Sequence, residues 1–428
     1  MLIRLLATRL AGQAADGVFQ AALFAAIAFN PEHQASPLAM AGALVVLVGP
    51  YSLVGPLIGG LLDRWDRRVV LLWANVIRSV LIVVTAGLLL AGLRQFVVLG
   101  AALVVMGASR FVAAGMSAAL PHVTDRESLI TLNAVFTTLG GVALMGGVGI
   151  AAGARMVLGA GTTGAAWVML VAVALGLLAA LLALTFSAGA LGPDLVDDPP
   201  TTASGSAGHV GHGVQRGVEA IIGAPSVALV LGAIGAHRAV FGINTLVLLV
   251  LANSTGESAG LRRFLLLVGA TALGALLAAF TTPVAVHHLG RTWTLAGSLA
   301  VGIGAQTVLL TFNLNILVVA VTIIGWVGQT VKLCGDLAMQ LDIADDTRGE
   351  VFAIQDAVFN LTFIAAALAA ALLVPATGHA AVLIIVGALI YTSALAEVVR
   401  RRLVDQVAPI DERRREPADP NRVRTSDQ

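Results

Sequence analysis

The sequence predicts an all-α membrane protein in which about twelve transmembrane helices form two pseudo-symmetric six-helix bundles. Hydrophobic residues make up 58% of the 428 residues and charged residues only 11%, whereas about a quarter of the residues in soluble domains are charged. The mean hydropathy is +0.93. Apolar runs of about 20 residues, the length that crosses a bilayer as a helix, recur along the whole chain. Because lipid offers no hydrogen-bond partner to backbone amides, these runs are expected to be helical.

The apolar runs give the predicted spans. In chain order they cover residues 9–29, 38–62, 69–92, 95–118, 130–153, 164–187, 227–251, 263–286, 293–312, 314–338, 357–377 and 380–399. The least defined boundary lies between the ninth and tenth runs, at Phe312–Leu314. The first run has no small-residue cleavage site at the usual distance, so we expect this helix to be retained. The 47 glycines suit helices that approach each other closely through small residues.

Changes in composition divide the chain into four segments. Residues 1–190 are predicted to form the N-terminal bundle and residues 226–402 the C-terminal bundle. Residues 191–225 are predicted to be a cytoplasmic linker that ends in a short interfacial helix, because the stretch from Gly192 to Gly208 is rich in Pro, Gly, Ser and Thr. Residues 403–428 are charged and lack apolar periodicity, which predicts a disordered tail or, alternatively, a lipid-binding segment.

The distribution of arginines predicts the orientation in the membrane. If the spans alternate, one side carries Arg4, Arg64, Arg67, Arg68, Arg126, Arg216, Arg291, Arg348, Arg400, Arg401, Arg402, Arg413, Arg414 and Arg415. The other side carries Arg94, Arg155, Arg262 and Arg263. Cytoplasmic loops are enriched in basic residues. We therefore expect a multi-pass protein of the plasma membrane with both termini in the cytoplasm.

A dense group of charges, Asp63-Arg64-Trp65-Asp66-Arg67-Arg68, separates the second and third apolar runs. Such a group is too costly to place in hydrocarbon, so it is predicted to be a short turn at one membrane face. The alternative is a basic cytoplasmic loop of some other polytopic protein.

This stretch resembles the loop between helices 2 and 3 of the major facilitator superfamily, Gly-x-Leu-Ala-Asp-Arg-x-Gly-Arg-Lys-x-x-Leu. The matching residues are Gly59, Leu61, Asp63, Arg64, Arg67, Arg68 (in place of Lys) and Leu71. Leu62 and Asp66 depart from the pattern. The resemblance implies a cytoplasmic gate, in which this loop holds the two halves together when the transporter is open to the outside. Its predicted residues are Gly59, Asp63, Arg64, Arg67 and Arg68.

The two halves resemble a diverged duplication. The tetrapeptide that begins at Asn133 recurs in similar form at Asp356. By nearly the same offset, Arg110 corresponds to Lys332, and Asp16 corresponds to His237 or Arg238. Parallel repeats of this kind place the binding site between the halves near the middle of the bilayer. In the superfamily, helices 1, 4, 7 and 10 line that central cavity.

Two connections resemble those of macrolide-efflux-like exporters. They are Ala119–Asn133, between the fourth and fifth spans, and Gln340–Phe352, between the tenth and eleventh. Many exporters also carry Gly-Pro-x-x-Gly-Gly in helix 5. The corresponding stretch here, Gly140–Gly153, has the glycines without the proline. This difference weakens the argument for drug–proton antiport but is compatible with a close helix contact.

Charged residues inside apolar runs are expected to be functional, because a charge in hydrocarbon costs at least a few kcal/mol. Arg9, Gln13, Asp16 and Gln20 fall on one stripe of the first helix. Asp16 lies roughly 10 Å from the inner edge and Arg110 roughly 12 Å, at 1.5 Å per residue. We therefore predict that Asp16 and Arg110 form a pair on the cavity wall, whose rearrangement couples transport to a proton. The alternatives are a static structural pair and an Arg110 that reaches the headgroups.

Other polar residues extend the predicted transport site. Lys332 and Asp336 are four residues apart, so they either neutralise each other locally or face the cavity. His237 and Arg238 lie deeper, where one of them either binds an anionic group or relays a proton, or both pack against polar groups. The predicted transport and coupling residues are thus Asp16, Arg110, Gln13, His237, Arg238, Lys332 and Asp336. Arg78 is predicted to be structural, because helix 3 is peripheral in the superfamily.

The sequence therefore predicts a transporter and not an enzyme. It contains no Walker motif, no arrangement typical of a catalytic triad and no metal-ligand cluster, so we expect no cofactor. The net charge of +1 gives no reason to expect nucleic-acid binding. We expect a monomeric, proton-coupled secondary transporter that exports small amphipathic compounds. A flippase for lipids or lysolipids, a solute importer, and a sensor or scaffold that has lost transport remain alternatives.

Overall fold

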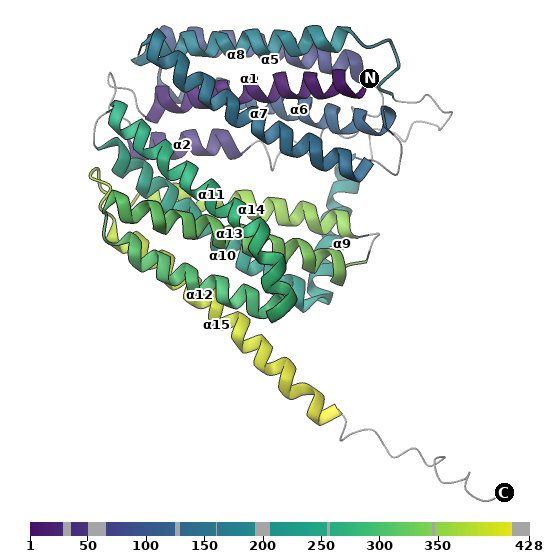
Figure 1. Cartoon of the computed structure of the whole chain (residues 1–428), viewed down its shortest axis with the longest axis vertical. Coiled ribbons are helices and arrows are strands. Elements are labelled where there is room, and N and C mark those ends of the chain that lie inside the picture. The colour runs from purple at the N-terminus through teal and green to yellow at the C-terminus, as the bar shows by residue number, and fades with distance from the viewer. Residues whose placement is uncertain are drawn as a thin grey trace, which may run out of the picture.

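The computed structural model describes residues 1–28, 36–49, 66–124, 129–159, 161–192, 206–254, 257–344 and 347–412. This part of the chain is helical and contains no strand (Figure 1). The helices are α1 (Leu2–Ala28), α2 (Pro37–Val48), α5 (Arg67–Leu90), α6 (Gln95–Ala119), α7 (Leu129–Leu158), α8 (Gly161–Leu184), α9 (Ser206–Gly223), α10 (Pro225–Asn253), α11 (Glu257–Leu289), α12 (Arg291–Leu309), α13 (Leu314–Asp342), α14 (Arg348–Ala371) and α15 (Ala381–Glu412), with a 3-10 turn, η1, at Leu120–His122.

Ten helices in the described ranges are long and apolar enough to cross a membrane. This number is smaller than the twelve spans predicted. The described part of the second span is the short helix α2, and the prediction for that span continues into residues outside the described ranges. The 19-residue helix α12 is not among the ten. The predicted break before α13 is present, because Phe312 adopts a positive φ of 49° between α12 and α13.

Two predicted boundaries differ from the structure. Helix α9 begins at Ser206, inside the stretch predicted as flexible linker, and it packs on α14. Helix α15 continues to Glu412, into the segment predicted as a disordered tail, and Figure 1 shows it running past the other helices. Ion pairs one helical turn apart, from Glu397 to Arg400 and Arg401, support the helix where its apolar run ends.

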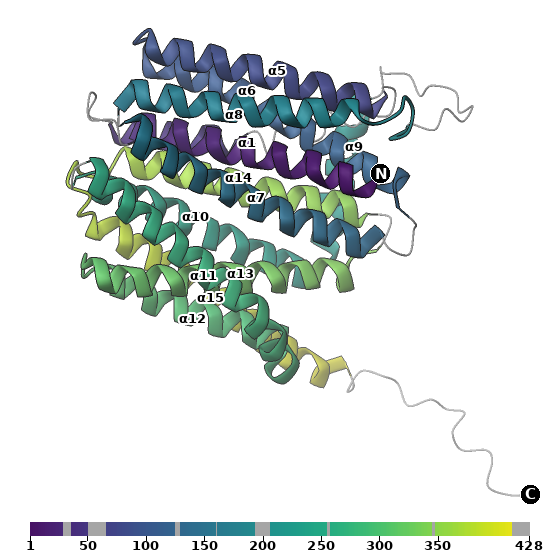
Figure 2. The same ribbon diagram turned by 45° about the horizontal axis from the view of Figure 1, so that its top comes forward.

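The helices pack as two groups, one from each half of the chain (Figures 1 and 2). In the first group, α1 packs on α7 and α8, while α5 packs on α6 and α8. In the second group, α11 packs on α13, α10 on α14, and α12 on α15. The two groups meet where α2 packs on α10 and α14.

Among the residues that the structure describes, the apolar core is shared between the groups at one end of the molecule. We call the end where α1 begins the near end and the end where α1 finishes the far end. The largest core cluster contains far-end residues of both groups, including Leu23, Met40, Ile82, Val98, Leu246, Phe264, Leu317 and Phe363. Near-end residues form separate clusters, one in the second group around Val227, Leu299 and Met339, and one in the first group around Leu5, Leu71 and Met116. The two groups are therefore held together by apolar packing chiefly at the far end.

Small residues allow the closest contact in the first group. A Cβ atom on Gly17 of α1 would overlap the carbonyl of Leu144 on α7, and one on Gly147 of α7 would overlap the carbonyl of Ala14 on α1. The close helix contact expected from the glycines of the fifth span is therefore present.

Candidate functional site

A cavity of about 530 Å³ lies between the two groups of helices. Its wall includes Phe24 of α1 and Leu44 of α2 from the first group, and Phe241 of α10 and Phe264 of α11 from the second. The rings of Phe24 and Phe264 stack with their centroids 5.2 Å apart, so the two groups touch directly at the far side of the cavity. A site shared by both groups changes shape whenever the groups move relative to each other.

The wall is mainly apolar, with a small number of polar side chains. The polar residues with longer side chains are Gln20, Arg155, His237, Arg238, Asn244, Gln329 and Lys332. Among the described residues, the charged members of this lining are all basic, and no Asp or Glu belongs to it. Among the predicted transport residues, His237, Arg238 and Lys332 line the cavity, whereas Asp16, Arg110, Gln13 and Asp336 do not.

Arg238 is held by aromatic rings. It is 8% exposed, and its Nε donates a hydrogen bond to the carbonyl of Phe359 at 2.9 Å. Its Cζ lies 3.8 Å from the ring centroid of Phe359, 4.7 Å from that of Phe363 and 5.1 Å from that of Phe241. Cation–π contacts of this kind stabilise a guanidinium without neutralising its charge. The guanidinium therefore keeps a full positive charge at the cavity wall.

His237, the residue before Arg238, is fixed by a different set of contacts. Its Nδ1 lies 2.8 Å from the hydroxyl of Tyr391 on α15, and both side chains are buried. The imidazole also stacks on Phe241. On its other side the ring lies against Gly328 of α13, where a Cβ atom would overlap Nε2. A glycine is therefore required at residue 328 for this ring position.

Lys332 forms the local pair that was one of the two predicted possibilities. Its Nζ donates to Asp336 Oδ2 at 2.7 Å, one turn along α13. Gln355 of α14 donates to the other oxygen of the same carboxylate at 2.9 Å. The positive charge of Lys332 is thus largely neutralised although its side chain lines the cavity.

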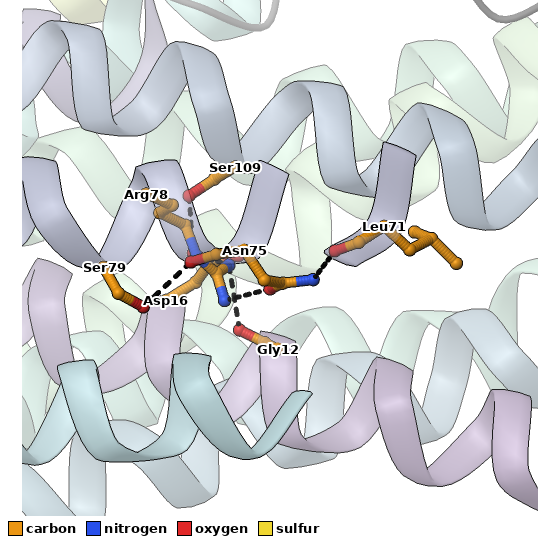
Figure 3. Close-up of polar contacts among 7 residues, drawn as sticks. All are labelled: Gly12, Asp16, Leu71, Asn75, Arg78, Ser79 and Ser109. Atoms are coloured by element: carbon orange, nitrogen blue, oxygen red, sulfur yellow. Dashed lines mark hydrogen bonds and ion pairs between the residues drawn. The ribbon is translucent and has the colours of Figure 1, made fainter. Parts of the chain in front are cut away.

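The structure gives Asp16 an ion-pair partner that was not predicted. The ion pair joins Asp16 Oδ1 to Arg78 Nη1 of α5 at 2.8 Å, and Ser109 of α6 donates to the same oxygen at 2.6 Å (Figure 3). Arg78 is 0% exposed, and its Nη2 donates to Asn75 Oδ1 at 2.7 Å. Arg110, the predicted partner, follows Ser109 on α6 and interacts electrostatically with Asp16 and with Asp356 of α14. Asp16 pairs with Arg78 because Arg78 points inward between α1 and α6.

Arg78, which was predicted to be structural, is thus a buried charge whose pairing with Asp16 was not predicted. The sequence already indicated a buried charge here, since Arg78 is a cation in the middle of the third apolar run. Asn244, which lines the cavity, was also missed, because a lone amide in an apolar run gives a much weaker signal than a charge. Gln13 was predicted at the cavity, but its side chain lies near the position of a Cβ on Gly140 of α7.

The predicted cytoplasmic gate is described only in part. Gly59, Asp63 and Arg64 lie outside the described residues. Arg67 lies 3.1 Å from the ring nitrogens of His122 and donates to the carbonyl of Leu191, while Arg68 donates to the carbonyl of Leu184. These partners all belong to the first half of the chain. The ranges that the structure describes contain no group of His, Cys, Asp and Glu suited to a metal ion.

Comparisons with known proteins agree with this architecture. No protein-family model matches the chain. Two uncharacterized MFS-type transporters, from Mycobacterium bovis and Mycobacterium tuberculosis, are each 43% identical to it over 405 residues, which cover 93% of this chain and 91% of each relative.

Solved transporters share the fold at low sequence identity. The nucleoside transporter NupG superposes with a TM-score of 0.68 at 10% identity, covering 93% of this chain and 98% of NupG. A POT family transporter in complex with a thioalcohol-conjugated peptide gives 0.67 at 11%, covering 92% and 95%. An inward-facing bacterial homolog of the human lysosomal transporter Spinster gives 0.59 at 15%, covering 93% and 97%. At these identities the likeness concerns the fold alone.

Proposed function

We propose, because this chain belongs to the family of MFS-type transporters, that it is a secondary active transporter that exports small amphipathic compounds by alternating access. The coarser conclusion, a multi-pass membrane transporter, follows from the relatives and the apolar helices. The observation that carries the finer proposal is the cavity lined by both groups of helices. Its mainly apolar wall with a few polar groups suits an amphipathic ligand.

The arrangement of the cores supports alternating access. Within the described ranges, the two groups share apolar packing at the far end, while each has its own core at the near end. Breaking the far-end contacts and closing the near end would expose the same cavity to the other side, as rocking of two repeats around a fixed site requires. The arginine distribution supports a near end that faces the cytoplasm. In this assignment the described conformation is the inward-open one.

The contacts of Arg67 and Arg68 agree with this assignment. In an inward-open state the cytoplasmic gate is released, so its basic residues are expected to bind within their own half. Their described partners, His122 and the carbonyls of Leu184 and Leu191, fulfil that expectation. We propose that they move to partners on the second half when the near end closes.

We propose that proton coupling occurs at the boundary between the groups. Asp16 and Arg78 belong to the same group, so rocking would not separate them. Asp356 interacts electrostatically with Lys332 and Asp336 of its own group. It also interacts with Arg110, which belongs to the other group. Movement of the groups changes the distance between Asp356 and Arg110 and therefore how strongly the Asp356 carboxylate holds a proton. We assign the coupling role to this pair.

The test is retention of fluorescent dyes in cells with and without the protein, with and without an uncoupler. We expect lower retention with the protein, and we expect the uncoupler to abolish the difference. Asp356→Asn is expected to abolish the part of dye export that the uncoupler inhibits. Glu219→Gln, a matched change at an exposed carboxylate of α9, is expected to leave it unchanged. Dye export that the uncoupler does not affect would contradict proton coupling, and equal retention across a broad dye panel would contradict export.

A further inference from the structure

We propose that the cavity selects amphipaths that carry one acidic group, a carboxylate or a phosphate, and that Arg238 binds this group. The inference rests on the proposed function, since it treats the cavity as the transport site. It adds a substrate class to the proposed function. Three features of the cavity support the inference: the sign of its charges, the free hydrogen-bond donors of Arg238 and the apolar wall.

The charges of the cavity have one sign. Its ionisable lining residues in the described ranges are Arg155, Arg238, Lys332 and His237, with no carboxylate. Lys332 is neutralised by Asp336, and Arg155 has interactions of its own, so neither is needed for the argument. Arg238 remains as a buried cation without an acidic partner among the described residues. A buried charge is costly unless it is paired, so an anionic ligand group would relieve this cost.

The guanidinium of Arg238 is prepared for such a ligand. Its Nε is occupied by the carbonyl of Phe359, and its plane is fixed by three aromatic rings. In the part of the chain that the structure describes, the two Nη atoms have no hydrogen-bond partner, and the residue lines the cavity. Two Nη donors suit the two oxygens of a carboxylate or phosphate. Because the side chain is already ordered, binding does not have to restrict its rotamers.

The apolar part of the ligand has its own surface. From Arg238 towards the far end, the wall consists of side chains such as Phe24, Leu44, Leu248 and Phe264. These side chains come from both groups, so an alkyl chain or ring system lying there would contact both. At about 530 Å³ the cavity falls within the size range of small-molecule sites, roughly 300–1,000 Å³.

The experiment is a binding competition on the purified full-length protein in a neutral detergent. Tritiated dodecyl phosphate is bound to immobilised protein and displaced by four competitors with the same chain: dodecanoate, dodecyl phosphate, dodecanol and dodecyltrimethylammonium. We expect both acids to displace the label at concentrations at least tenfold lower than the alcohol, and the cation to be weaker still. The ratio between dodecanoate and dodecyl phosphate shows whether carboxylate or phosphate is preferred. Equal displacement by the alcohol and the acids would overturn the inference.

Variants of Arg238 test whether this residue causes the preference for acids over the alcohol. Arg238→Gln is expected to reduce the acid-over-alcohol ratio to about one, whereas Arg238→Lys, which keeps the charge but loses the planar fork, is expected to retain part of it. Arg262→Gln removes an exposed arginine of α11 as the matched control and is expected to change nothing. A full acid preference in a folded Arg238→Gln protein would contradict the assignment. If Arg238→Gln does not fold, the wild-type series still decides the charge preference.

The two levels of the proposal fail in different ways. Uncoupler-sensitive export of neutral or cationic dyes, together with no acid preference in the competition, would remove the substrate class and leave the transporter in place. Acid-selective binding without any uncoupler-sensitive export would keep the site and remove the proposed export.

Discussion

At the scale of single residues, the pair of Asp16 and Arg78 is a buried ion pair that also takes in Ser109 and Asn75. Arg78 is fully buried, and Asp16 accepts hydrogen bonds from Arg78 and Ser109 on the same oxygen (Figure 3). Removing one member of a buried pair leaves an uncompensated charge, which typically costs about 3–5 kcal/mol. The pair is therefore expected to hold α1, α5 and α6 together.

We predict that Asp16→Asn and Arg78→Gln each lower the thermal unfolding midpoint of the purified protein strongly. The midpoint of the double variant should fall by less than the sum of the two single falls, because the members of a direct pair are coupled. Arg400→Gln, which removes an exposed ion pair on α15, serves as the control and should have a much smaller effect. Additive losses in the double variant would show that the pair does not act as a unit.

Two buried amides lack partners, and they differ in their position relative to the cavity. Among the described residues, both side-chain polar atoms of Asn244 and of Gln306 are buried without a hydrogen bond. Asn244 lines the cavity and Gln306 does not. An unsatisfied buried polar group costs about 1–3 kcal/mol, so an apolar side chain of similar shape should stabilise the fold.

We therefore predict that Asn244→Leu and Gln306→Met both raise the unfolding midpoint. Only Asn244→Leu should also change transport, because only that amide is placed to bind a ligand or to find a partner when the cavity changes shape. Dye retention and thermal unfolding, measured on the same variants, separate the two effects. Loss of transport in Gln306→Met with unchanged transport in Asn244→Leu would contradict this assignment.

At the scale of helices, the crossing of α1 and α7 depends on the absence of side chains. A Cβ on Gly147 would overlap the backbone of Ala14, whereas one on Gly141, also on α7, would meet nothing within 4 Å. We predict that Gly147→Ala lowers the unfolding midpoint and impairs transport, because α7 must move away from α1. Gly141→Ala should be neutral or stabilising, since alanine favours a helix over glycine by about 1 kcal/mol in soluble peptides. Equal behaviour of the two variants would show that the crossing adapts without cost.

The same helices show what the sequence can and cannot predict. Apolar length located the helices, and the depth of Asp16 along the first helix predicted a position inside the membrane region. Depth along a helix does not indicate which way a side chain faces. Depth alone therefore could not show whether Arg110 or Arg78 pairs with Asp16. The burial of Arg78 depends on the rotation of α5 against α1 and α6, which apolar periodicity defines poorly when nearly every residue is apolar.

At the scale of the whole molecule, the sequence predicted two related halves with a site between them but contained no information about conformational state. That information comes from which residues share a core. The far-end cluster joins both groups, while the near-end clusters do not. A transporter that rocks must break the far-end contact, and the stacked rings of Phe24 and Phe264 lie directly on that contact.

We predict that a cross-link between residues 24 and 264 stops transport reversibly. Phe24→Cys and Phe264→Cys, in a Cys334→Ala background that removes the single native cysteine, are joined with a short reducible bis-thiosulfonate reagent. Dye export should fall with the cross-linked fraction and return on reduction. Thr281→Cys and Trp326→Cys, which replace a hydrogen-bonded pair within the second group, form the matched control and should remain active when cross-linked. Full export by protein cross-linked at residues 24 and 264 would mean that the far end does not open, and the cavity would then need another route to the second side.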